Sequence, residues 1–352
     1  IIYTIMGMIP YYLMLLIILI CAYHFKENMP KQQKKVILTI SLLPMFCLLA
    51  FKAESIGTDT ANYINMFKDS GAYLKIDQES RIELGYQYLV LFLNKYFGAH
   101  QFLFIFSAFF ICFSLYKFII RTATNYALAL FFFTTLGFFQ FSISGIRQAL
   151  AIAISLFAFK YIQERKLIKY TTIVALATLF HKSALFCLPI YWIMNMKTST
   201  KNMIIMVIGI FSAYLLAEPF LLTAADVMNY NYGIESTNNG FIFMFIVLLI
   251  TVACYKHRQE LQGHNISSRF LINANYISLL LWVIRLVSRT AERLSLFVMP
   301  YTYISLEQYL TTRPSNKKSI YTIVAVLVAG YLFVHRMSPS EYLNNYLFFW
   351  QQ

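Results

Sequence analysis

Charged residues are scarce in this 352-residue sequence, at 12% of the chain, whereas hydrophobic residues make up 59%. A soluble domain usually carries about twice that share of charge, because its surface faces water. The scarcity excludes an ordinary soluble protein, and the long apolar runs have the length of membrane-spanning helices. We therefore expect an integral membrane protein surrounded by a lipid bilayer.

Cysteines are also few, and the sequence lacks the common signatures of nucleotide and metal chemistry. The five cysteines lie in apolar runs at irregular spacing, which favours neither a disulfide framework nor a metal site. No Walker A sequence, G-x-G-x-x-G or His-Glu-x-x-His is present. An ATP-driven pump, a Rossmann-type nucleotide-sugar enzyme and a zinc protease are therefore poorly supported, and we expect no cofactor and no metal.

Apolar runs predict an all-α polytopic membrane protein with about twelve transmembrane helices in a single integral membrane domain, residues 1–352. The first run lacks a basic start and a small-residue cleavage site, so we interpret it as a span and not as a signal peptide. The shorter segment 82–97 carries charges at both ends and predicts an interfacial or re-entrant helix. The spans are expected approximately at 3–24, 36–51, 100–119, 126–142, 146–163, 168–181, 183–196, 202–217, 240–255, 270–287, 294–310 and 319–335.

The formal charge of +14 is distributed unevenly over the loops. Because cytoplasmic loops are enriched in Lys and Arg, the basic set is predicted to lie in the cytoplasm, and the charge needs no nucleic-acid partner. The remaining loops nearly balance acids and bases, so both termini and the two longest loops, 52–99 and 218–239, are predicted outside. The basic loops are 24–36, 117–125, 160–169, 197–201, 256–269 and 311–318.

Three arginines, Arg285, Arg289 and Arg293, recur every four residues between two apolar runs. On an α-helix this spacing lines three guanidiniums along one face, with Glu292 best placed to pair with Arg289. An arginine costs about 2.5–3.5 kcal/mol at the membrane centre, so three clustered cations indicate an anionic partner. Snorkelling at a membrane edge is the alternative, but the predicted outer location favours the anionic partner.

Other polar motifs fall on the same predicted side. Each has a plain structural alternative, since Thr58 or Asp59 can cap a helix, Glu83 favours a helix start, and His181–Ser183 can form a hairpin turn. Together they combine carboxylates that accept a proton or bind hydroxyls, arginines that hold phosphates, and aromatics that stack on sugars. This combination is what a sugar-diphosphate site needs.

The motifs, in their order along the chain, resemble the EpsG family, whose members look like Wzy-type polymerases of O-antigen and exopolysaccharide. The resemblance runs from about residue 36 to 310 and implies a GT-C-like fold in the bacterial inner membrane with a site facing the periplasm. The motifs that carry it are Gly57-Thr-Asp59-Thr-x-x-Tyr63, Glu83-x-Gly85-Tyr86, Ser144-Gly-Ile-Arg147-Gln148, His181-Lys-Ser183 and Glu292-Arg293-Leu294.

The resemblance further implies that undecaprenyl-diphosphate-linked repeat units, as donor and acceptor, are joined by metal-independent, inverting glycosyl transfer. A chain-length-regulating co-polymerase is a family-level expectation for a partner. Asp59 is the first choice for the base that activates the acceptor hydroxyl, with Glu83 or His181 as substitutes. The diphosphate is assigned to Arg147, Lys182, Arg285, Arg289 and Arg293, and the sugars to Tyr63, Tyr86 and Gln148.

Two other functions remain open from the sequence. An O-antigen ligase uses the same kind of donor but usually carries one very large periplasmic loop late in the chain, where 218–239 is short. A flippase for lipid-linked oligosaccharides would place cations inside spans on both sides of the midplane, whereas the unusual cations here gather at one face.

Overall fold

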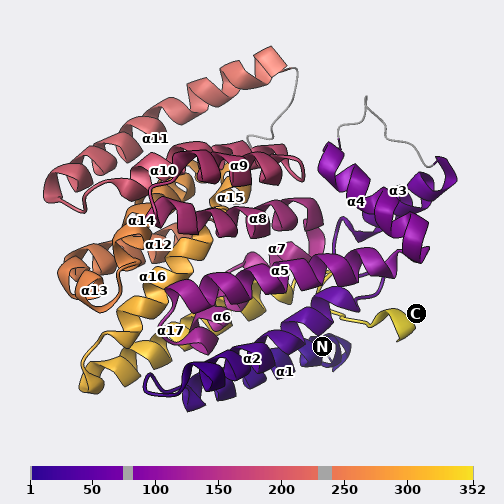
Figure 1. Cartoon of the computed structure of the whole chain (residues 1–352), viewed down its shortest axis with the longest axis horizontal. Helices are drawn as coiled ribbons and strands as arrows, with labels where there is room; N and C mark the ends of the chain where they lie inside the picture. The colour runs from indigo at the N-terminus through magenta and orange to yellow at the C-terminus, as the bar shows by residue number, and fades with distance from the viewer. Residues whose placement is uncertain (1, 74–81, 229–239, 352) are drawn as a thin grey trace. The chain divides into compact units, whose positions relative to one another are not determined.

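The computed structural model describes residues 2–73, 82–228 and 240–351 (Figure 1). Within these ranges every regular element is a helix, so the all-α prediction is confirmed. The chain divides into two compact units. Unit 1 comprises Ile1–Ala158, Thr171–Leu185 and Ser315–Gln352, and unit 2 comprises Phe159–Tyr170 and Phe186–Pro314.

Unit 1 is built around α2, which packs against α1, α5 and α6 (Figure 1). Its core contains phenylalanines that are almost completely buried, and Phe133 and Phe138 meet edge to face at 5.8 Å. Its helices are α1 (Ile2–His24), α2 (Lys31–Ala50), α3 (Thr60–Tyr73), α4 (Leu84–Phe97), α5 (Gln101–Thr122), α6 (Tyr126–Thr135), α7 (Phe138–Ser144), most of α8 (Ile146–Gln163), most of α9 (Leu167–Thr178), most of η1 (Lys182–Phe186), α17 (Ser315–Met337) and η3 (Phe349–Gln351).

Unit 2 is organised around α14 (Ser268–Ile284), which is buried along nearly its whole length. This helix packs against α10, α11, α12, α15 and α16. Because it has neighbours on all sides, its apolar residues need no single face. The surrounding helices are α10 (Cys187–Asn195), α11 (Thr200–Met228), α12 (Phe241–Lys256), α13 (Arg258–His264), α15 (Thr290–Ser295) and α16 (Met299–Thr311).

Several helices are suited to a bilayer, and the chain is a multi-pass membrane protein. In the described part, α1, α2, α5 and α17 are long and apolar enough to cross, and the count rises to six if two bent pairs are each one span. These pairs are α6–α7, bent by 56°, and α12–α13, bent by 75°. The predicted count of about twelve is not confirmed, because several expected spans are short: α9 has 12 residues, only about 18 Å.

The arginine stretch differs from its prediction. Instead of one helix that carries three stacked guanidiniums, α14 ends at Ile284 and α15 begins at Thr290. Ser288 lies in the break, and its hydroxyl accepts a hydrogen bond from the Thr290 backbone N–H at 3.3 Å. Serine and threonine side chains compete for backbone groups that a continuous helix would use, so the periodic spacing does not produce a single arginine stripe.

The two long loops that are predicted outside also contain more structure than expected. The segment 52–99 includes α3 and α4, and α4 confirms the helix predicted near 82–97. In the segment 218–239, α11 continues to Met228, so the predicted loop is helical over its first part. Residues 229–239 lie outside the described residues.

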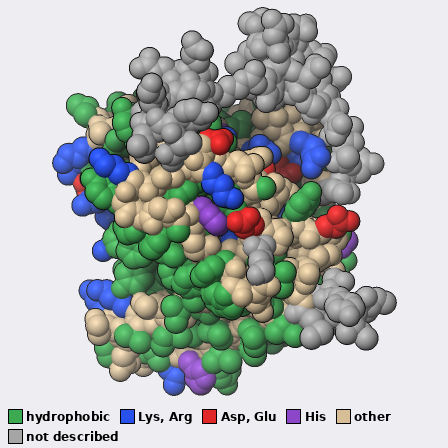
Figure 2. Space-filling view, turned by 90° about the vertical axis from the view of Figure 1, so that its right-hand side faces the viewer, with side chains coloured by type: hydrophobic (Ala, Val, Ile, Leu, Met, Phe, Trp, Pro, Cys, Tyr) green, Lys and Arg blue, Asp and Glu red, His purple; other side chains and the backbone are tan. Residues whose placement is uncertain are grey.

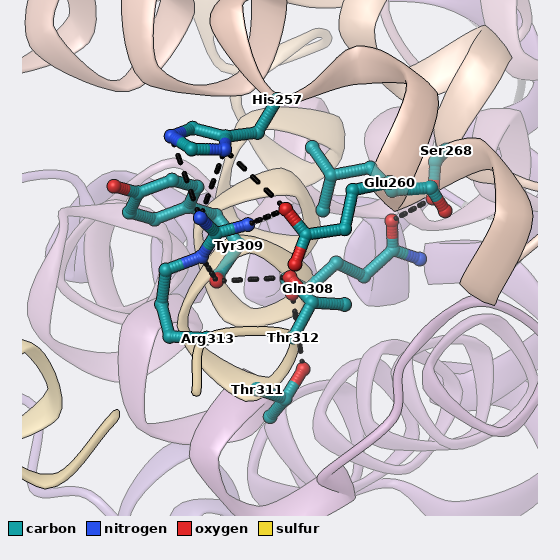
Figure 3. A network of polar contacts seen from close by, with 9 residues as sticks. His257, Glu260, Ser268, Gln308, Tyr309, Thr311, Thr312 and Arg313 are labelled. Atoms are coloured by element: carbon teal, nitrogen blue, oxygen red, sulfur yellow. Dashed lines mark hydrogen bonds and ion pairs between the residues drawn. The ribbon is translucent and has the colours of Figure 1, made fainter. Parts of the chain in front are cut away.

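A polar network joins two predicted cytoplasmic loops within unit 2 (Figure 3). Arg313 donates to Glu260 at 2.7 Å and lies 2.9 Å from the His257 ring. In unit 1, Lys318 likewise approaches Glu27 at 3.5 Å. Loops that touch must lie on the same side of a membrane. These contacts join the loop 311–318, through Arg313 and Lys318, to the loops 256–269 and 24–36, and the charge pattern predicts all three in the cytoplasm.

This sidedness predicts a labelling result. In a protein whose five cysteines are replaced by alanine, Arg165→Cys and Ala99→Cys should react with a membrane-impermeant thiol reagent from opposite sides, the former from the cytoplasm. Both positions are exposed, so access does not limit the reaction. Labelling of both from one side would contradict the topology.

Candidate functional site

Four of the five sequence motifs come together within unit 1. The loop before α3 contacts the α7–α8 junction, since the Thr58 backbone N–H donates to the Ser144 hydroxyl at 3.2 Å. The start of α4 contacts the turn after α9, where the Tyr86 backbone N–H donates to the Leu179 carbonyl at 3.2 Å. Segments up to about 120 residues apart in sequence therefore form one cluster. In Figure 2, which views the side where Figure 1 draws α3 and α4, acidic, basic and histidine side chains gather.

Glu83 and Arg147 form the central ion pair of this cluster. The Glu83 carboxylate accepts from Arg147 Nη1 at 2.7 Å with one oxygen and from the Lys182 backbone N–H at 3.1 Å with the other. Glu83 is buried, while the Arg147 side chain retains 25% of its exposure. The carboxylate thus orients the guanidinium through Nη1, and part of the Arg147 side chain stays accessible. Its buried Nε has no hydrogen-bond partner among the described residues.

His181 is held by its own turn. Its Nδ1 accepts a hydrogen bond from the Ser183 backbone N–H at 3.3 Å and lies 2.5 Å from the Ser183 hydroxyl. When Nδ1 of a neutral imidazole accepts, the ring proton resides on Nε2. The arrangement therefore favours His181 as a hydrogen-bond donor over a base. The Lys182 side chain is exposed beside it.

Asp59 stands at the entrance to α3 and is partly exposed. Its loop is held on two sides, by Ser144 through Thr58 and by the Gly57 backbone N–H, which donates to the Tyr342 carbonyl at 3.0 Å. The Asp59 carboxylate and the Arg147 guanidinium both act electrostatically on the Tyr63 hydroxyl. An accessible carboxylate and a partly exposed guanidinium thus flank the same buried tyrosine.

The residues predicted to bind sugars are buried. Tyr63 and Tyr86 pack on each other with ring centroids 5.8 Å apart, and Gln148 is also inside. Burial raises the pKa of Tyr63, and the nearby Arg147 guanidinium partly opposes that shift. Rings enclosed in this way favour a packing role over stacking on a sugar.

Gly57 permits the close approach of the Asp59 loop to α7, which leads to a prediction. Its φ is 96°, and a Cβ would stand 2.9 Å from the Ile143 carbonyl oxygen. Gly57→Ala should therefore push the loop away and lower activity by about 10²-fold. Gly98 is a matched control because its φ is also positive, at 71°, but no atom of the described residues lies within 4 Å of the position that a Cβ would take. Equal activity of the two alanine variants would contradict the steric account.

The fifth motif lies in unit 2. Arg285 is buried, and its Nε donates to Glu292 at 2.7 Å, while its Nη1 has no hydrogen-bond partner in the part of the chain that the structure describes. The sequence favours Arg289 as the partner of Glu292, whereas the structure pairs Glu292 with Arg285, because the chain turns back between α14 and α15 and brings these two side chains together. Arg289 and Arg293 have exposed side chains.

Sequence reasoning missed Lys52, which is 1% exposed and hydrogen-bonded to the Asp59 loop and to α7. A signal was available, because Lys52 follows an apolar run on the predicted outer side, where lysines are infrequent. Sequence reasoning also gave no weight to the segment after residue 335, although Tyr342 contacts Gly57.

Fold and site together define a multi-pass, all-helical membrane protein with a charged cluster at helix ends. The model of the EpsG family matches residues 35–348, and the chain belongs to this family, which is associated with Wzy-type polysaccharide polymerases. No curated protein and no solved structure matches the chain. Across the described residues, no three His, Cys, Asp or Glu side chains are grouped as metal ligands would be.

Proposed function

We propose that this protein joins undecaprenyl-diphosphate-linked oligosaccharide repeat units on the periplasmic face of the bacterial inner membrane. The observation that carries the proposal is the cluster in unit 1, where an accessible carboxylate, an oriented guanidinium and a histidine–serine turn come together in a member of the EpsG family. A basic group and an acid–base group are the two components that transfer from a sugar diphosphate requires.

Asp59 acts as the base. The acceptor hydroxyl attacks the anomeric carbon of the donor, the bond from that carbon to the diphosphate oxygen breaks, and the hydroxyl proton passes to the Asp59 carboxylate. Glu83 is less suited to this task because both its oxygens accept hydrogen bonds from Arg147 and Lys182. We assign Glu83 to the orientation of Arg147, and His181 to donation of a hydrogen bond through Nε2.

Arg147 stabilises the departing diphosphate. Negative charge accumulates on the leaving group in the transition state, and a pre-oriented cation then needs no reorganisation. The guanidinium already has its position set by Glu83, and the exposed part of its side chain can donate hydrogen bonds to phosphate oxygens. Lys182 adds a second cation, since its backbone N–H shares the Glu83 carboxylate with Arg147 and its side chain is exposed.

The arginines of unit 2 bind a lipid diphosphate as well, since the reaction uses one on the donor and one on the acceptor. Arg289→Lys should remove most polymer formation, because lysine lacks the planar two-donor fork. Arg285→Lys should be milder in activity, because Arg285 is buried and a lysine keeps a charge for Glu292. Polymer yield at matched membrane abundance measures both, and near-normal yield from Arg289→Lys would favour simple snorkelling.

The chemistry of the product tests the mechanism. Attack from the face opposite the diphosphate inverts the anomeric configuration, so the new glycosidic bond should have the configuration opposite to that of the donor. One lipid diphosphate should be released for each bond formed. NMR of the product, together with phosphate counting, measures both, and retention of configuration would instead indicate a covalent glycosyl–enzyme intermediate.

A further inference from the structure

Lys52 is a fully buried lysine in the loop that follows α2. Its ammonium hydrogen-bonds to three oxygens: the Thr60 hydroxyl at 2.7 Å, the Ile56 carbonyl at 3.3 Å and the Ile143 carbonyl. Its Nζ also lies 4.7 Å from the centre of the Phe104 ring. A lysine ammonium has three N–H donors, so all three are used in this arrangement.

The three acceptors belong to two separate segments. Ile56 and Thr60 flank Asp59 in the loop and the start of α3, and the Thr60 hydroxyl itself donates to the Ile56 carbonyl at 2.5 Å. Ile143 lies near the end of α7, four residues before Arg147. The same nitrogen therefore connects the segment that carries Asp59 with the segment that carries Arg147.

Burying a lysine is costly unless its donors are satisfied. Burial lowers the pKa of Lys52 to about 7, and the Asp59 carboxylate partly opposes that shift. Across the described residues the contacts of Nζ are neutral oxygens and an aromatic ring, so no direct ion pair compensates the burial. A fold that needed only apolar packing at this position would be served better by methionine or leucine.

We propose that Lys52 is a positioning residue whose ammonium holds the Asp59 loop against the Arg147 turn. The inference rests on the proposed function for its catalytic consequence, but the holding contact can be measured without activity. Lys52 itself does not touch substrate, because it is enclosed behind Thr60 and Ile143.

The first experiment measures the contact directly. In a cysteine-free background, Thr58→Cys and Ser144→Cys place thiols on two residues that are already in contact, since the Thr58 backbone N–H lies 3.2 Å from the Ser144 hydroxyl. Mild oxidation should cross-link them, and Lys52→Met should slow the cross-linking about tenfold, because separated segments lower the effective thiol concentration. Lys68→Met, at an exposed lysine on α3, is the control and should leave the rate unchanged. Equal rates with and without the Lys52→Met substitution, or no cross-link when Lys52 is present, would overturn the proposal.

The second experiment uses activity. Lys52→Met should lower kcat by about 10²-fold, the effect of a small misplacement of a catalytic group. If Lys52 acts through Asp59, adding Lys52→Met to Asp59→Asn should cause little further loss, because residues that act as a unit are not additive. A multiplicative loss would indicate a separate role and would overturn the proposal.

Thr60→Val provides a second variant should Lys52→Met fail to fold. It removes one acceptor while it keeps the side-chain shape, and it should reduce both the cross-linking rate and kcat less than Lys52→Met; unchanged values of both would count against the proposal. If the unaltered protein forms no polymer, the proposed function fails, whereas the cross-linking rates still decide the role of Lys52.

Discussion

Asp59→Asn is expected to lower the kcat of polymer formation by about 10²–10⁴-fold. The amide keeps the size of the carboxylate but cannot take the proton from the acceptor hydroxyl. Because Asp59 is partly exposed, the substitution should leave folding and membrane abundance intact. The measurement is the rate of glycan elongation by purified variants at equal protein concentration.

Asp69→Asn is a matched control, since Asp69 is an exposed acid on the same helix, α3, and should retain normal activity. Glu83→Gln provides the contrast within the site. It can still accept a hydrogen bond and should lose less activity than Asp59→Asn. An active Asp59→Asn with an inactive Glu83→Gln would transfer the role of base to Glu83.

Arg147→Lys is expected to lower kcat by about 10²–10³-fold, the usual cost of one lost transition-state donor. Lysine keeps the charge, but it lacks the planar guanidinium that can donate to Glu83 and to a phosphate at the same time. The loss should appear mainly in kcat, because negative charge on the diphosphate oxygens is greatest in the transition state. Steady-state kinetics with a lipid-linked donor measure it.

The control for Arg147→Lys is Arg121→Lys. Arg121 lies in the last turn of α5, within the segment 117–125 that is predicted to face the cytoplasm. This control variant should keep normal activity. If Arg147→Lys also elongated glycans normally, the guanidinium would serve only as the partner of Glu83, and the phosphate role would have to be assigned elsewhere.

Much of the site could be predicted from local sequence. Asp59, Glu83, Arg147 and His181 were identifiable because polar residues are rare in this chain and stand out between apolar runs. The contact between Glu83 and Arg147 could not be predicted, because it depends on how α4 meets α8 across 64 residues of sequence. Burial of Tyr63 and Tyr86 was likewise hidden, since a tyrosine can pack inside or face a ligand with the same local pattern.

The arginine stretch shows where periodicity misleads. A spacing of four residues favours one helical face only if the helix continues, and here α14 ends at Ile284, before α15 begins at Thr290. Lys52 was missed for the opposite reason, because a single lysine after a span has the appearance of a membrane-edge anchor. Its importance comes from acceptors on Ile143, which lies 91 residues away.

The most direct measurement of the central claim uses the purified protein with lipid-linked repeat units as donor and acceptor, in detergent, with EDTA present. A ladder of products that grows by whole repeat units is expected. It should form without a membrane partition, and its formation should be insensitive to the chelator. A flippase would give no new glycosidic bond under these conditions, and a ligase would give transfer to a different acceptor without a ladder. Absence of elongation by a folded protein that binds the donor would contradict the account.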